Sequence, residues 1–190
     1  MEKFLTIVKE MKVVIFDMYG VINFGSGVSP TVLQTLKTLR EDGKIVIILS
    51  NASFGSADAV SKYAKKGMFK GVHYDDVVTS GQFGYEAIQR GDVPVPGTTM
   101  YVFGTANFKR PEDKLPDLFK DSVYSVTEDM EKADFAYCGV PQIHGEDRMD
   151  IDDFIPELEK IRKRNLEMVC ANPDLRANEG GKFVVRQGLI

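Results

Sequence analysis

The chain has 190 residues, of which 43% are hydrophobic and 27% are charged, and its formal net charge at pH 7 is −4. This composition is ordinary for a globular protein, and the length suits one sizeable domain or two small ones. The slight acidic excess gives no electrostatic basis for nucleic-acid binding. The N-terminal apolar run is too short for a signal peptide, and no stretch is long enough to cross a membrane. We therefore expect a cytoplasmic protein with neither nucleic-acid nor membrane partners.

Apolar runs and helical spacing define the expected elements in chain order. Ser29-Pro30 begins the first helix and Gly43 ends it. Residues 74–80 are expected to lead into the third helix, and residues 91–98 form a loop. The pattern predicts strands at residues 13–16, 45–49, 100–103, 133–138 and 167–170, helices at residues 30–42, 57–66, 82–90, 114–120 and 151–164, and a final extended piece at 183–186.

Strands and helices alternate throughout, so the predicted fold class is α/β with a parallel sheet. The first two strands enclose one helix, which makes them parallel neighbours or near neighbours. Asp17 follows the first strand, and Ser50 and Asn51 follow the second. Ligands bind at the carboxyl ends of such strands, so these residues are candidates for one site. A purely structural interpretation, in which Asp17 caps a turn, stays open at this point, as does helix capping by Ser50 and Ser53.

Four short motifs carry a resemblance to a known family. The stretch FDMYGVI at residues 16–22 resembles the first motif of the haloacid dehalogenase superfamily, and ILSN at 48–51 resembles the second. With Thr79-Ser80 and the NPD at 172–174, the chain resembles the NagD-like branch. The resemblance implies a Rossmann-like parallel-sheet core with an inserted α/β cap. Residues 1–80 would be the N-terminal half of the core, 81–174 the cap, and 175–190 a return segment.

The same resemblance implies a Mg²⁺-dependent phosphatase that acts on a small phosphorylated metabolite. Asp17 would be the nucleophile that forms an aspartyl-phosphate. The Asp17 carboxylate and the backbone carbonyl of Tyr19 would hold Mg²⁺. Ser50 and the N–H of Asn51 would bind the phosphoryl group. Asp174 would face the active-site entrance, unless it serves only as part of a turn.

Two features depart from the family pattern. Tyr19 occupies the position where relatives usually have a second aspartate, and a phenol with a pKa of about 10 is a poor base at neutral pH. No Gly-Lys-Pro motif is present, and Gly181-Lys182-Phe183 is a poor substitute. We therefore expect an incomplete core within these residues, belonging either to a longer protein or to one that depends on a partner, with homo-oligomerisation through the open sheet edge as an option.

The alternative to the enzyme is a catalytically inactive protein of the same fold that binds a phosphorylated ligand or acts as a scaffold. A flavodoxin-like receiver is weaker, because no acidic cluster surrounds Asp17. Cys138 and Cys170 are predicted to be buried free thiols. His73 and His144 are predicted to be surface histidines. The remaining acidic run is predicted to begin the following helix rather than to bind a metal; it comprises Asp147, Asp150, Asp152 and Asp153.

Overall fold

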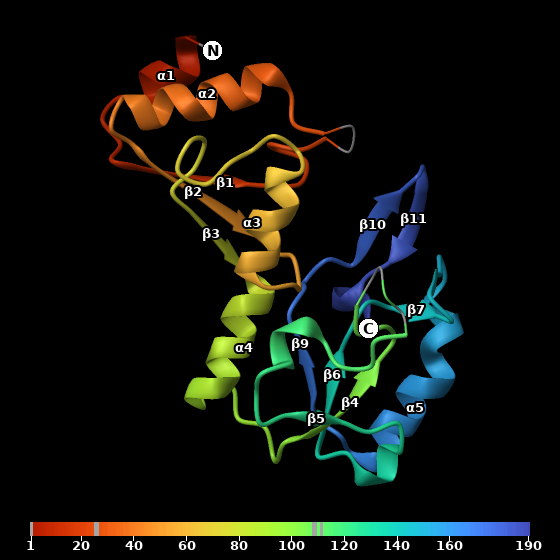
Figure 1. Cartoon of the computed structure of the whole chain (residues 1–190). Helices are drawn as coiled ribbons and strands as arrows, with labels where there is room; N and C mark the ends of the chain where they lie inside the picture. The colour runs from red at the N-terminus through yellow and green to blue at the C-terminus, as the bar shows by residue number, and fades with distance from the viewer. Residues whose placement is uncertain (1, 25–26, 108–109, 111) are drawn as a thin grey trace. The chain divides into compact units, whose positions relative to one another are not determined.

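The polypeptide separates into two units in the computed structural model, which describes residues 2–24, 27–107, 110 and 112–190 (Figure 1). Unit 1 comprises the chain up to Ser50 together with Phe54–Thr79. Unit 2 comprises Asn51–Ser53 and Ser80–Ile190. The chain thus changes units at the ends of two strands, and each unit has its own sheet and core.

The sheet of unit 1 consists of three parallel strands, β1 (Val13–Asp17), β2 (Ile45–Ser50) and β3 (Asp76–Thr79), in the order β1-β2-β3. The predicted strands at 13–16 and 45–49 are confirmed as parallel neighbours. β3 was not predicted as a strand, because its four residues include only two apolar side chains. It forms by pairing with β2, a tertiary contact that local pattern does not reveal.

The described residues of unit 1 include the helices α1 (Glu2–Val8), α2 (Pro30–Glu41) and α3 (Ser56–Ala64). The start of α2 follows the sequence signal, since the Ser29 hydroxyl accepts a hydrogen bond from the Val32 N–H at 3.3 Å. The predicted helices at 30–42 and 57–66 are confirmed, whereas α1 was not expected.

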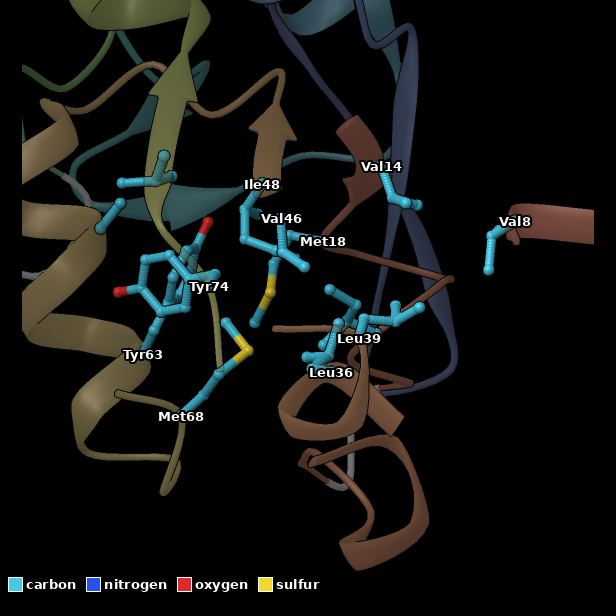
Figure 2. Packing of buried hydrophobic residues seen from close by; sticks show 13 residues of the cluster. Val8, Val14, Met18, Leu36, Leu39, Val46, Ile48, Tyr63, Met68 and Tyr74 are labelled. Atoms are coloured by element: carbon cyan, nitrogen blue, oxygen red, sulfur yellow. The ribbon is translucent and has the colours of Figure 1, made fainter. Parts of the chain in front are cut away.

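One face of the β1-β2-β3 sheet is covered by the core of unit 1 (Figure 2). Tyr63 of α3 and Tyr74 pack edge to face with ring centroids 6.2 Å apart, and both are fully buried. The fully buried residues of this core include Met18, Leu36, Leu39, Val46, Ile48, Met68 and Tyr74. Burial of this apolar surface is the main source of stability for the unit.

The opposite face of the same sheet is exposed. Side chains alternate between the faces of a strand, and in-register partners on parallel strands share a face. Val13 pairs with Ile45, and Leu49 pairs with Val78. These four and Ile15 are 40–59% exposed. An apolar sheet face without cover is unusual for a parallel sheet, which ordinarily has helices on both sides.

Unit 2 is built on a four-stranded parallel sheet in the order β5-β4-β6-β9. The strands are β4 (Thr99–Phe103), β5 (Ser125–Val126), β6 (Phe135–Cys138) and β9 (Met168–Cys170). The helices are α4 (Ser80–Arg90) and α5 (Ile155–Arg164). The 3₁₀ turn η3 (Ile151–Phe154) directly precedes α5. The predicted strands at 100–103, 133–138 and 167–170 are confirmed, and so are the helices at 82–90 and 151–164.

Smaller elements complete unit 2. Two antiparallel hairpins occur, and the second contains the extended piece predicted at 183–186. The helix predicted at 114–120 is wrong: only a 3₁₀ turn forms there, directly after Pro116, which cannot donate a backbone hydrogen bond. The elements are η1 (Asp117–Phe119), η2 (Met130–Lys132), β7 (Gln142–Ile143), β8 (Glu146–Asp147), β10 (Arg176–Glu179), β11 (Lys182–Val185) and η4 (Gln187–Leu189).

The four-stranded sheet of unit 2 is buried on both faces at its inner strand β6, as is usual for a parallel sheet. All four residues of β6 are buried, and they alternate between two separate clusters. Ala136 and Cys138 face the cluster that contains Ile161 of α5. Phe135 and Tyr137 face the cluster that contains Phe119. This sheet therefore has cover on both faces, whereas no described residue covers the second face of the sheet in unit 1.

Candidate functional site

Each strand of unit 1 ends on a polar residue: β1 on Asp17, β2 on Ser50 and β3 on Thr79. Ser50 pairs directly with Thr79, and Asp17 is one register position behind, opposite Leu49. Since the strands are parallel, their carboxyl ends share one edge of the sheet. One carboxylate and two hydroxyl groups thus lie at the carboxyl ends of adjacent strands, where parallel sheets bind ligands.

A tight backbone turn fixes the chain after Asp17. Met18 is fully buried, and its carbonyl accepts the Asn23 N–H at 2.8 Å. Gly20 has φ +84° and donates its N–H to the Asn23 carbonyl at 2.9 Å, a conformation that glycine adopts without strain. Backbone groups close this turn, and within the described residues the exposed Asp17 carboxylate has no hydrogen bond or ion pair. Turn capping by Asp17 is therefore not its role, and the carboxylate faces solvent.

The two hydroxyl groups at the edge lie much deeper than the carboxylate. Ser50 is 2% exposed, and Thr79 is fully buried with its hydroxyl donating to the Phe54 carbonyl at 2.7 Å. Burial raises the pKa of Tyr63 to about 12, and the nearby Ser50 hydroxyl opposes part of that rise. The negative charge of Asp17 adds to it, so Tyr63 lies within electrostatic reach of both predicted site residues and stays protonated.

Sequence reasoning named Thr79 as part of a family motif without placing it at this edge, and it missed Asn23. Asn23 is 3% exposed, although asparagine is usually a surface residue. Its backbone forms isolated β-bridges with Tyr19 and Val28. Thr79 could have been found from the Val77-Val78 pair before it, had residues 74–80 been read as a third strand. Asn23 has no such signal, because its burial depends on the turn after β1.

The segment that follows Ser50 does not form the expected helix cap. Asn51, the predicted phosphate-binding N–H donor, follows Ser50 in a short segment that groups with unit 2. Ser53 does not cap α3, because Gly55 occupies the N-cap position. The Ser53 hydroxyl instead accepts a hydrogen bond from the Gln187 side-chain amide at 3.3 Å. The helix-capping interpretation of Ser53 is therefore wrong.

Asp174 is half-buried and lies in a turn that its backbone helps to close. Its N–H donates to the Asn172 side-chain oxygen at 2.8 Å, and its carbonyl accepts the Gly188 N–H at 2.8 Å. A Cβ at Gly188 would lie 2.2 Å from the Pro173 carbonyl oxygen, so only glycine permits this approach. The turn interpretation is confirmed, and a ligand-binding role for the Asp174 carboxylate stays a prediction.

The described part of the chain contains no group of three or more His, Cys, Asp or Glu side chains arranged to hold a metal ion. The acidic run is divided between two elements: Asp150, Asp152 and Asp153 begin η3, as predicted, whereas Asp147 lies in β8, so its predicted place at the start of the helix is wrong. The Asp150 carboxylate caps η3 by accepting the Asp152 N–H at 3.1 Å, and Asp147 forms a 3.0 Å ion pair with the buried Arg186. The donors predicted for Mg²⁺ remain the Asp17 carboxylate and the Tyr19 carbonyl.

Two predictions about titratable side chains are wrong. His144 is exposed as expected, but His73 is only 8% exposed, and its Nδ1 accepts the Phe69 N–H at 3.0 Å. Burial lowers the pKa of His73, so its neutral form is favoured. Cys138 is buried as predicted, whereas Cys170 is exposed. In both cases the sequence neighbourhood was a poor guide to burial.

Comparisons with known proteins identify relatives of this fold. A sequence model described as haloacid dehalogenase-like hydrolase matches residues 14–115. A haloacid dehalogenase-like hydrolase from Brucella suis superposes with a TM-score of 0.78 at 22% identity, covering 97% of this chain and 62% of that one. A 4-nitrophenylphosphatase from Thermotoga maritima has a TM-score of 0.63 at 21% identity, with coverages of 96% and 63%. A protein provisionally described as nagD superposes with a TM-score of 0.64 at 20% identity, covering 94% of this chain and 63% of that one.

These matches cover nearly all of this chain but less than two thirds of each relative. At such low identity they establish a shared fold. No curated protein matches the sequence. Within the described residues, no helix is long and apolar enough to span a membrane.

Proposed function

Because the chain belongs to the haloacid dehalogenase-like hydrolase family, we propose that it is a phosphatase that acts on a small phosphorylated metabolite through Asp17. The observation that carries this proposal is the exposed Asp17 carboxylate at the carboxyl end of β1, held by a turn that leaves it without a structural partner. Phosphatases among the proteins of similar fold support the reaction class.

In the proposed reaction, a carboxylate oxygen of Asp17 attacks phosphorus while the bond from phosphorus to the leaving-group oxygen breaks. The Ser50 hydroxyl and the Asn51 N–H would hold the non-bridging oxygens of the phosphoryl group. Water then attacks the phosphorus of the aspartyl-phosphate, which releases phosphate and regenerates Asp17. Ser50 is buried, so a phosphoryl group would reach its hydroxyl only at the carboxyl end of β2.

Proton transfer is the step of this mechanism for which the site has the poorest catalytic group. The leaving-group oxygen must gain a proton and the attacking water must lose one, yet the side chain after Met18 is a phenol. Tyr19 is 46% exposed, and general acid–base catalysis is typically worth about 10²–10⁴-fold. We propose a slow catalyst that favours substrates whose leaving group departs as a stable anion, since these need no protonation.

The donors at the edge fit a weak Mg²⁺ site. Mg²⁺ usually keeps several waters and takes one or two carboxylates, which matches one Asp17 carboxylate and one Tyr19 carbonyl. When bound, the ion would offset the negative charge that gathers between the carboxylate and the phosphoryl oxygens. Asp17 would therefore orient both the ion and the phosphorus atom.

The remaining parts of the proposal concern the whole protein. We propose that residues 81–174 are a cap that selects the substrate, with Asp174 facing the active-site entrance, and that 175–190 lead back toward the core. In the structure, residues 175–190 belong to unit 2. A cytoplasmic location, homo-oligomerisation and the absence of nucleic-acid and membrane partners belong to the same proposal.

Hydrolysis of p-nitrophenyl phosphate with Mg²⁺ tests this function, because p-nitrophenolate leaves without a proton. The wild type is expected to be active, chelation of Mg²⁺ to lower the rate, and Asp17→Asn to abolish it. Asp42→Asn is the matched control, since Asp42 is an exposed aspartate at the end of α2. Equal loss in both variants, or unchanged activity in Asp17→Asn, contradicts the assignment of Asp17.

The second candidate is a non-catalytic protein that binds a phosphorylated ligand at the same edge. Tyr19 favours it, because binding needs no acid–base group. Its signature is Mg²⁺-dependent binding of inorganic phosphate by calorimetry, weakened by Ser50→Ala, in a wild type that does not hydrolyse p-nitrophenyl phosphate. Turnover that depends on Asp17 excludes this candidate.

A further inference from the structure

The two cysteines of the chain meet at the carboxyl edge of the sheet in unit 2. Cys138 is the last residue of β6, Cys170 is the last residue of β9, and the two are in-register partners. In-register residues on neighbouring strands lie about 4.8 Å apart. Disulfide-bonded cysteines usually have Cα atoms about 4.4–6.8 Å apart, so the backbone already has the required spacing.

Both sulfur atoms point to the same side of the sheet. Cys138 packs in the cluster that contains Phe154 and Ile161, and Met168, which precedes Cys170 by two residues, packs against that cluster. Side chains two residues apart share a face of a strand. The Cys170 thiol donates to the Asn172 carbonyl at 3.2 Å, and the Cys138 thiol donates to the Gly139 carbonyl at 3.7 Å. Nothing therefore has to rotate across the sheet for the sulfur atoms to approach.

The two thiols differ in accessibility. β9 is an edge strand of the sheet, and Cys170 is exposed, whereas Cys138 on the inner strand is 1% exposed. The neighbouring Cys138 thiol lowers the pKa of Cys170 to about 6, and the neighbouring Cys170 together with burial raises the pKa of Cys138. At neutral pH the exposed sulfur is thus the nucleophile, and the buried one keeps its proton.

We propose that Cys138 and Cys170 form a peroxide-sensitive dithiol that closes to a disulfide between β6 and β9. The Cys170 sulfur attacks one oxygen of hydrogen peroxide, the O–O bond breaks, and the released hydroxide takes a proton to give water. Cys170 is then a sulfenic acid. The Cys138 sulfur attacks the Cys170 sulfur, the S–O bond breaks, and the hydroxyl leaves as water with the Cys138 proton. Two electrons pass from the sulfurs to the peroxide.

The proposed thiol chemistry does not use Asp17, because both cysteines lie in unit 2 and Asp17 lies in unit 1. A disulfide would covalently join the edge strand to the inner strand just before the turn that contains Asp174. Oxidation is therefore expected to stabilise the end of β9 against local opening.

The test is stoichiometric treatment of the full chain with hydrogen peroxide, followed by denaturation, thiol alkylation and mass spectrometry. The expected result is loss of both free thiols in the monomer, a mass loss of two hydrogen atoms, and a linked pair of tryptic peptides, residues 133–148 and 165–176. Dithiothreitol should restore both thiols. Oxidation of Cys170 to a sulfinic acid while Cys138 can still be alkylated overturns the proposal. A disulfide between two chains overturns it as well.

Two variants separate the roles of the sulfurs. Cys138→Ser should leave Cys170 as a sulfenic acid that dimedone captures, and Cys170→Ser should protect Cys138 from oxidation. Equal oxidation of Cys138 in Cys170→Ser overturns the order of events. If the buried Cys138→Ser change prevents folding, the peptide linkage in the wild type still decides whether the disulfide forms.

Discussion

At the scale of single side chains, Tyr19 bears most directly on the rate of the proposed phosphatase. It is exposed and lies two residues after Asp17, where the resemblance noted in the sequence implies an acid–base aspartate. We expect Tyr19→Asp to raise the rate of hydrolysis of phosphate esters with poor leaving groups by at least ~10²-fold, since it restores general acid–base catalysis. Steady-state rates with an alkyl phosphate, compared with p-nitrophenyl phosphate, measure the gain.

Tyr19→Phe is the matched control for that substitution. It removes the phenol hydroxyl but supplies no carboxylate, so its rates should equal those of the wild type. A gain in Tyr19→Asp that is equal for both esters would show that the aspartate improves metal binding rather than proton transfer.

His73 gives unit 1 a pH-dependent stability. Burial lowers its pKa in the folded state, with the positive charges of Lys37 and Arg40 acting in the same direction. The unfolded chain therefore binds the proton more tightly, and the stability contributed by neutral His73 is complete above the unfolded pKa of about 6.5. It is lost as the pH falls below that value. We expect the urea midpoint of unit 1 to decrease between pH 7.5 and pH 5.5.

His73→Asn isolates that contribution. The asparagine side-chain oxygen can still accept the Phe69 N–H, but it does not titrate. The variant should lose less stability than the wild type over the same pH interval. Identical pH profiles for the two proteins would assign the dependence to other groups.

At the scale of elements, the end of α5 offers a direct test of backbone strain. Asn165 has φ 55° and ψ 38°, and its N–H caps the helix by donating to the Ile161 and Arg162 carbonyls. The left-handed conformation costs most residues about 1–2 kcal/mol but costs glycine little. Asn165→Gly should therefore be more stable than Asn165→Ala by roughly 1 kcal/mol, measured by chemical denaturation of unit 2. Equal stabilities would show that the helix end rearranges.

Most elements were predictable because their signals are local. The apolar runs of β1, β2, β4, β6 and β9 and the Ser29-Pro30 start of α2 each lie within a few residues. β3 and β5 were not predictable, because both are short and exist only by pairing with a longer neighbour. The predicted helix at 114–120 failed where Pro116 limits the backbone to a single 3₁₀ turn.

At the scale of the whole molecule, the uncovered face of the unit 1 sheet is the largest departure from an ordinary parallel sheet. Its exposed side chains are Val13, Ile15, Ile45, Leu49 and Val78. We expect this chain to bind an apolar fluorescent dye in its native state, because contiguous exposed apolar surface binds such dyes. Ile15→Lys should reduce the fluorescence, whereas Gln34→Lys, an exposed change of similar charge on α2, should not. Native wild-type protein without dye fluorescence would show that the face is covered.

The sequence by itself determined the α/β class, the parallel pairing of the first two strands and the placement of Asp17 and Ser50 at strand ends. These follow from residues that are close in the chain, so local physics suffices. Only the tertiary structure decided that Thr79 completes the edge, that His73 is buried, and that Cys138 meets Cys170. Each of these depends on contacts between distant segments, and burial is a property of what packs above a residue rather than of its neighbours in the chain.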